Sequence, residues 1–232
     1  MRGKGLRGGR VQQGIQHIII RKKFTEAEDL YHDTGLQSTP EEASCFPGSF
    51  AQHGATGIRP EALLFRGERD KFLFLSLLQQ TATRFRSRIL AFVLMDTHAH
   101  LLVQSNQISI FIGTLCSRYA AGYHKKYATR GPLFRKTFIN FVKDYDLWQI
   151  DTLLYILNNP LEAGICKRHK DYFFSSYKLN IEVPTVLADI ISIDNSLLRK
   201  HFKSAAQFKK ALSHKLRFQK STAHIKYPNR HK

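Results

Sequence analysis

Two histidines separated by a single residue are the first pair of side chains that could do chemistry. His98 and His100 stand in the apolar segment LMDTHAHLLV, which favours a β-strand. Because side chains alternate across a strand, both imidazoles are expected on one face, where they could bind one metal ion. The pattern alone is weak, since a chain with eleven histidines is expected to contain roughly 0.5 such pairs by chance. Two structural or surface histidines remain the alternative.

A tyrosine and an asparagine form the second pair. Tyr155 and Asn159 lie in the segment YILNNP at the end of an expected helix. Residues four apart share one helical face, so a phenol and an amide oxygen are expected side by side. The alternative is a half-buried core tyrosine, followed by an asparagine that ends the helix before Pro160.

Taken together, four segments resemble a known family. LMDTHAHLL, GPLFRKTF, YILNNPLEAG and FFSSY follow one another in the order and spacing of the HUH single-tyrosine transposases. They are most similar to the REP-associated tyrosine transposases and their insertion-sequence relatives. The resemblance spans about residues 14 to 180 and includes GIQHIIIR and LLFRGERDKFLFL.

The resemblance implies both a site and a reaction. In that family the two histidines and a polar residue one turn after the tyrosine bind Mg²⁺ or Mn²⁺, which here implies His98, His100 and Asn159. The nucleophile would be Tyr155, which attacks a phosphodiester of single-stranded DNA, forms a 5′-phosphotyrosine link and frees a 3′-hydroxyl. Two neutral imidazoles and an amide leave the metal charge uncancelled, so it can stabilise the transition state.

Several positions depart from the family pattern. Asp96 and Thr97 replace the Pro-Asn that commonly precedes the first histidine, and Ala99 replaces a bulky apolar residue. Ala99 is expected to face away from the metal. The Asp96 carboxylate is expected either to approach the metal or to cap a turn. The segment GPLFRKTF also departs at Pro132, Arg135 and Thr137, which affects the expected substrate specificity.

The charge balance points to a polyanionic partner. Thirty-six Lys and Arg face eighteen Asp and Glu, a formal net charge of +18, and such a field concentrates nucleic acid around a protein. Single-strand binding uses cations alternating with aromatic rings. That mixture occurs in two segments and predicts nucleic-acid contacts at Arg118, Lys125, Lys126, Arg135 and Lys136. Core packing is the alternative for the neighbouring tyrosines.

Composition also excludes several classes of protein. The three cysteines are odd in number and far apart, which disfavours a disulfide framework and a thiolate zinc site. We expect no membrane span, no secretory signal and no nucleoside-triphosphate loop. The expected setting is cytoplasmic and nucleoid-associated, with single-stranded or hairpin DNA as partner and a monomer or homodimer as the assembly.

Hydrophobic periodicity predicts an α+β fold with a mainly antiparallel sheet and helices packed on it. The family resemblance narrows this to a ferredoxin-like or RRM-like HUH fold. Strands are predicted at residues 14–20, 88–95, 98–104 and 138–142. Helices are predicted at residues 68–85, 108–128 and 145–158, the last one ended by Pro160.

The chain divides into three expected parts. Residues 1–13 form a basic N-terminal arm, residues 14–180 a catalytic domain with an insertion at 24–62, and residues 181–232 a basic, partly helical C-terminal extension. The extension has no acid after Asp194 and a possible helix at residues 197–212. Its cations are expected either to form a solvated face or to contact phosphates.

Three functions agree with these residues. The first is a metal-dependent enzyme that cleaves and transfers single strands and acts on hairpin-forming DNA. The second is a domesticated relative, weakly active or inactive, that binds structured single strands as a regulator. The third is a replication-initiator or plasmid-mobilisation nickase, whose tyrosine usually lies in a different sequence context. Retention of all four site residues favours the first.

Overall fold

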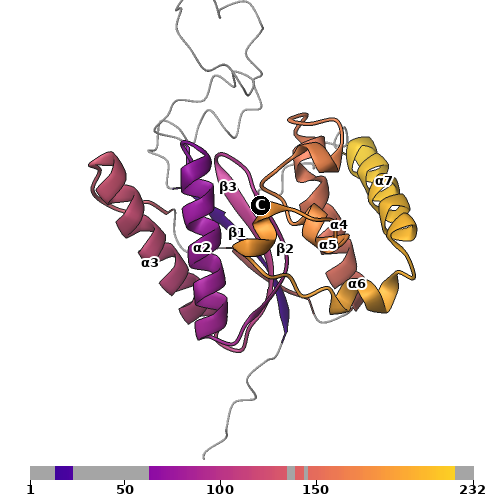
Figure 1. Ribbon diagram of the computed structural model, residues 1–232, viewed down its shortest axis with the longest axis horizontal. Helices are drawn as coiled ribbons and strands as arrows, with labels where there is room; N and C mark the ends of the chain where they lie inside the picture. The colour runs from indigo at the N-terminus through magenta and orange to yellow at the C-terminus, as the bar shows by residue number, and fades with distance from the viewer. Residues whose placement is uncertain (1–13, 23–62, 135–138, 144–145, 223–232) are drawn as a thin grey trace, which may run out of the picture.

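A four-stranded sheet forms the centre of the computed structural model, which describes residues 14–22, 63–134, 139–143 and 146–222. For residues 139–143 and 218–222 it describes the backbone alone. The core elements follow in the order β1 (Ile15–Arg21), α2 (Glu68–Arg84), β2 (Arg88–Leu94), β3 (His98–Gln104), α3 (Ile108–Tyr127) and β4 (Ile139–Lys143). The helix α4 (Asp146–Glu162) comes next (Figure 1).

The pairing of the strands confirms the predicted fold class. Neighbours in the sheet follow the order β2-β3-β1-β4, and every pair is antiparallel. This is the βαββαβ arrangement of ferredoxin-like folds. In the β1–β3 pair, Arg21 lies opposite His98 and Ile19 opposite His100.

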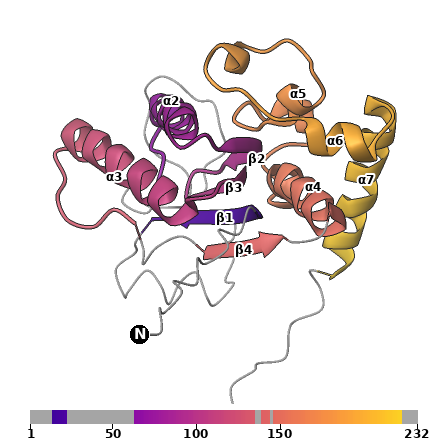
Figure 2. The same cartoon turned by 90° about the horizontal axis from the view of Figure 1, so that it is seen from below.

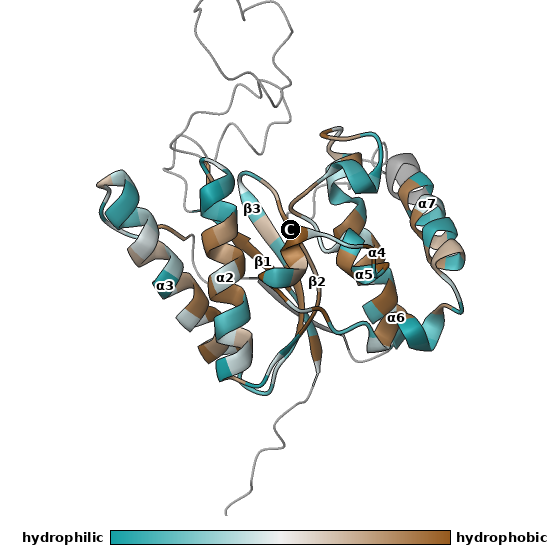
Figure 3. Ribbon diagram, viewed as in Figure 1, coloured by the Kyte–Doolittle hydropathy of each residue, from teal (hydrophilic) through white to brown (hydrophobic). Residues whose placement is uncertain are grey.

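Each face of the sheet has its own apolar core. Ala99, Leu101 and Val103 of β3 pack with α2 and α3, whereas Leu102 packs with α4. Figure 2 shows α2 and α3 on one side of the sheet and α4 on the other, and the hydrophobic sides of these helices turn toward the strands (Figure 3). The alternation in β3 therefore turns Ala99 toward α2 and α3, and both histidines toward α4.

The helix α4 does not end before Pro160, as the sequence predicted, but continues to Glu162 with the proline inside it. Proline has no N–H to donate to the carbonyl four residues earlier, which is that of Ile156. The side-chain amide of Asn159 donates instead to that carbonyl at 3.4 Å and to the Tyr155 carbonyl at 2.8 Å. Gly164, with a φ of 71°, follows the helix in the left-handed conformation that suits a C-terminal cap.

Short elements connect α4 to the C-terminal helices. They are η2 (His169–Asp171), α5 (Tyr177–Asn180), η3 (Val186–Asp189), α6 (Ser196–His201) and α7 (Ala205–Thr222). No helix in the described part of the chain is both long and apolar enough to cross a membrane. The N-terminal arm, residue 23, the expected insertion at residues 24–62 and residues 223–232 lie outside the described residues.

The prediction of a single helix at residues 197–212 is wrong, because two helices, α6 and α7, occupy this segment. Phe202 adopts an extended conformation after α6. Ser204 then caps α7, its hydroxyl accepting from the Gln207 N–H at 3.3 Å, while the Gln207 side chain accepts from the Lys203 N–H at 2.8 Å. These two bonds resemble a capping box, which starts a new helix.

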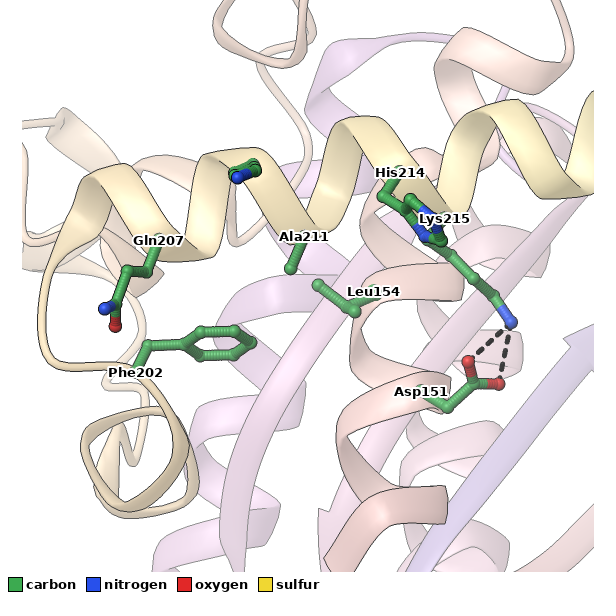
Figure 4. Close-up of a pocket in the computed structure, with 8 residues that line it drawn as sticks. Asp151, Leu154, Phe202, Gln207, Ala211, His214 and Lys215 are labelled. Atoms are coloured by element: carbon green, nitrogen blue, oxygen red, sulfur yellow. Dashed lines mark hydrogen bonds and ion pairs between the residues drawn. The ribbon is translucent and has the colours of Figure 1, made fainter.

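The helix α7 packs against α4. Phe208 and Leu212 are buried in the core that α4 shares with the sheet. The buried Asn158 side chain of α4 donates to the Leu212 carbonyl at 3.0 Å. Lys215 reaches from α7 to both carboxylate oxygens of Asp151, at 2.6 and 2.8 Å (Figure 4). The C-terminal helix therefore helps to hold α4 in place.

Replacing Leu212 by alanine tests this packing. Leu212 is fully buried, so its truncation leaves a cavity, and we expect the free energy of unfolding to fall by about 3 kcal/mol. Chemical denaturation measures the change. Ser213→Ala, at an exposed neighbouring position, serves as the control and should change stability by under about 0.5 kcal/mol. Equal stability of the two variants would show that α7 does not pack as described.

Candidate active site

The structure brings Tyr155 beside the two histidines of β3. The ring centroids of His98 and His100 are 4.9 Å apart, and those of His100 and Tyr155 are 5.8 Å apart. A third imidazole, that of His17 on β1, lies 6.0 Å from the Tyr155 ring. The phenol on α4 and two of the histidines on the sheet, His17 and His100, are therefore in edge-to-face contact.

Each of the paired histidines has its Nδ1 atom held by a neighbour. The Thr97 hydroxyl lies 2.9 Å from His98 Nδ1, and His17 Nε2 lies 3.1 Å from His100 Nδ1. Such contacts fix the ring orientation and the tautomer of metal-binding histidines. With Nδ1 so engaged, Nε2 is the atom of each ring that could bind a cation.

Asn159 supplies a third possible donor. Both hydrogen bonds of its side chain to backbone use the nitrogen, so its amide oxygen is the atom that could take a cation. No group of three or more His, Cys, Asp and Glu within the described ranges could hold a metal ion. Two neutral imidazoles and an amide oxygen form an open donor set that fits a cation which keeps water or substrate oxygens as further ligands.

Burial keeps both imidazoles neutral. It lowers the pKa of His98 to about 4, with a further contribution from the positive charge of Arg21. Burial also lowers the pKa of His100 well below its usual range, helped by the neighbouring His98, His17 and Arg21. A neutral imidazole is the form that can bind a metal. The two rings are therefore ready to act as ligands at neutral pH.

The phenol, in contrast, keeps its proton. Burial raises the pKa of Tyr155, and the negative charge of Glu162 adds to this effect. The charge of Arg21 and a hydrogen bond with the Asn159 side chain partly oppose it, because both stabilise the phenolate. Attack by this hydroxyl therefore needs further activation from a bound cation or a base.

Sequence reasoning did not single out His17 and Arg21 as site residues. Both lie on β1, where alternate positions face the same side, and the register places Arg21 opposite His98. The signal was present in GIQHIIIR, because two polar residues four apart interrupt one face of an otherwise apolar strand. Arg21 is exposed, so its guanidinium is accessible to an anion at the site.

The structure also settles the position of Asp96. Its carboxylate forms an ion pair with Lys71 of α2 at 2.6 Å, and its carbonyl accepts hydrogen bonds from the N–H groups of Leu64 and Phe65. The side chain thus anchors the turn before β3 to α2. Of the two expectations for Asp96, a structural role at the turn is the one that these contacts support.

Three of the five predicted nucleic-acid contacts lie apart from this centre. Arg118, Lys125 and Lys126 belong to α3, on the other side of the sheet from Tyr155 (Figure 2). The Arg118 guanidinium donates to Gln80 at 2.6 Å, and Lys126 pairs with the buried Asp70 at 2.5 Å. Lys125 is exposed. Arg135 and Lys136 lie outside the described residues. DNA contact at these five positions stays a prediction.

No protein-family model matches the sequence, and no curated protein matches it. Among solved structures, the fold is similar to that of a REP-associated tyrosine transposase bound to a REP hairpin. The two chains are 10% identical, with a TM-score of 0.49, over 87% of this chain and 96% of the other.

The half-buried His98 makes stability depend on pH. Because folding lowers the pKa of His98 from 6.5 to about 4, the unfolded chain binds this proton more readily than the native one between these values. Stability should therefore fall as the pH drops through this window, by up to about 3 kcal/mol for this one group. His98→Gln should remove that part of the slope in chelator-treated protein. Identical slopes for both proteins in denaturation at several pH values would contradict this assignment.

Proposed function

We propose that the chain is a metal-dependent enzyme that cleaves and rejoins single-stranded DNA through Tyr155, in the manner of the HUH single-tyrosine transposases. The observation that carries the proposal is the position of the Tyr155 ring, 5.8 Å from that of His100, whose own ring is 4.9 Å from that of His98. A nucleophile and two neutral metal-binding side chains thus meet at one place, in a protein with a formal net charge of +18.

The proposed reaction is a transesterification. The Tyr155 oxygen forms a bond to the phosphorus of a backbone phosphodiester, and the bond from phosphorus to the 3′ oxygen breaks. The phenolic proton is lost to solvent, and the departing 3′ oxygen gains one, which leaves a 5′-phosphotyrosine and a free 3′-hydroxyl. The reverse reaction with another 3′-hydroxyl joins strands. Because the bond energy is conserved, no nucleoside triphosphate is needed.

The chain's own residues would position these groups. His17 and Thr97 orient the two imidazoles, and Asn159 both stabilises the end of α4 and hydrogen-bonds the phenol. Arg21 is placed to bind a non-bridging phosphate oxygen through a charge-assisted hydrogen bond. Its charge also favours the phenolate and so partly offsets the rise in the pKa of Tyr155 that burial and Glu162 cause.

A divalent cation, Mg²⁺ or Mn²⁺, would be held by His98, His100 and Asn159. When bound, it would polarise the phosphate and stabilise the negative charge that builds up on it. The tyrosine lies beside histidines of its own chain, so one subunit holds every group that the proposal needs. Hairpin-forming DNA is the proposed substrate class, and the cytoplasm, in association with the nucleoid, the proposed location.

A covalent adduct is the direct test of the nucleophile. We expect the protein, incubated with an end-labelled hairpin carrying single-stranded flanks and Mg²⁺ or Mn²⁺, to yield a protein–DNA species that survives denaturing electrophoresis. Tyr155→Phe should yield none, because it lacks the attacking oxygen. Tyr177→Phe, which changes a buried tyrosine in the same core, is the matched control and should still react.

The outcomes separate the candidate functions. An adduct of equal amount in Tyr155→Phe would refute the proposed nucleophile. Tight binding of the hairpin with no adduct, in the presence of either cation, would support instead a regulator that grips structured single strands without cutting them.

Removing one imidazole tests the metal site. His98→Ala should reduce the cleavage rate at least about 100-fold, because the cation loses a ligand. DNA affinity should change only a few-fold, since phosphate contacts elsewhere dominate binding. Gel-shift titration and single-turnover cleavage measure the two effects. Parallel loss of binding and cleavage in a folded variant would count against a role for His98 in metal binding.

A further inference from the structure

A partly exposed tryptophan at the start of α4 has no role in the proposed reaction. Trp148 is 56% exposed, and its neighbour Leu147 is 74% exposed. Other positions of this helix that flank it, such as Gln149 and Ile150, are buried. Trp148 therefore presents part of its indole ring to solvent.

Trp148 lies on the same edge of α4 as the candidate nucleophile. Seven residues separate it from Tyr155, which is two helical turns or about 10 Å along the axis. Asn159 continues the same edge one turn further on, and both Tyr155 and Asn159 are half-buried. A strand whose phosphodiester lies at Tyr155 and which follows this edge would pass Trp148 within about three nucleotides.

The surface between Trp148 and Tyr155 does not repel a phosphate backbone. Asp151 is the acid on this stretch, and Lys215 of α7 pairs with both of its oxygens. Beside it runs a groove between α4 and α7, about 640 Å³ in volume, which is also lined by Lys210 and His214 (Figure 4). Both of these basic side chains are exposed. Proteins that bind single strands combine cations, which follow the phosphate backbone, with aromatic rings, on which bases stack; Asp151 of α4 lines the groove that holds these cations.

We propose that Trp148 is a stacking platform for an unpaired base of the same DNA strand that presents its phosphodiester to Tyr155. This inference rests on the proposed function, and it adds a binding position for a base to a site otherwise built for a phosphate. The occupant is a single-stranded flank rather than a duplex stem, because a paired base does not offer its face to a side chain. Stacking on an aromatic ring tolerates any base, so the contact would hold the strand in place without reading its sequence.

The chain contains one tryptophan, so its fluorescence reports on this position alone. Tyr155→Phe protein, which cannot form the adduct, is titrated with a hairpin that carries an unpaired flank. A second hairpin has abasic sites in the flank and therefore the same number of phosphates. We expect the first hairpin to quench the emission strongly and the abasic one to leave it nearly unchanged.

Measurements of DNA affinity on variants provide a second test of stacking on Trp148. Trp148→Ala should weaken binding of the base-bearing hairpin roughly tenfold or more, the usual effect of losing one stacking partner. Trp148→Phe should retain most of the affinity, because phenylalanine keeps an aromatic face. Leu147→Ala, at the more exposed neighbouring position, is the matched control and should stay within about twofold.

Three results would overturn the inference. They are equal quenching by the base-bearing and abasic hairpins, unchanged affinity of Trp148→Ala, and a shift of the emission with protein concentration in the absence of DNA. The last would mean that a second copy of the chain covers the ring. Each leaves the proposed function intact, because adduct formation at Tyr155 is measured separately. Conversely, if the wild-type protein formed no adduct, the proposed enzymatic function would be refuted. The quenching of Trp148 emission by the base-bearing hairpin would not be affected by that result.

Discussion

The antiparallel pairing of β1 with β3 is the constraint on which the candidate centre depends. This register places Arg21 opposite His98 and Ile19 opposite His100, and it brings His17 to within 3.1 Å of the His100 ring nitrogen. A shift by one residue would turn the polar side chains of β1 into the core beneath α2 and α3. The apolar residues that alternate with them, such as Ile18 and Ile20, are buried in that core and so maintain the register.

The second requirement is a helix that holds its tyrosine over this strand pair. The α4 helix gains support at both faces: Ile156 and Leu157 pack in the core against the sheet, while Asn158 and Asp151 bind α7. Asn159 links this support to the site, because its amide bonds the carbonyl of Ile156, which Pro160 cannot serve, and also stabilises the phenolate of Tyr155. The side chain of Asn159 thus connects the packing and backbone geometry of α4 with the ionisation of Tyr155.

Local periodicity predicted much of this arrangement. The strand containing HAH and the helices beginning at Glu68 and Ile108 depend on patterns within a few residues, and the structure confirms them. Three features depend on contacts that no local pattern contains: the continuation of α4 past Pro160, the break before Ser204, and the pairing of His17 with His100. The capping sequence SAAQ and the polar positions of GIQHIIIR were readable signals, but their meaning required knowledge of what lies beside them.

The proposed reaction requires that His98, His100 and Asn159 hold a divalent cation beside the hydroxyl of Tyr155. Diffraction from crystals soaked in Mn²⁺, recorded near the manganese absorption edge, tests this claim most directly. We expect one strong anomalous peak within bonding distance of Nε2 of both histidines, on the side of the sheet covered by α4. A peak elsewhere, or none at this position while the protein remains folded and the imidazoles neutral, would contradict the claim.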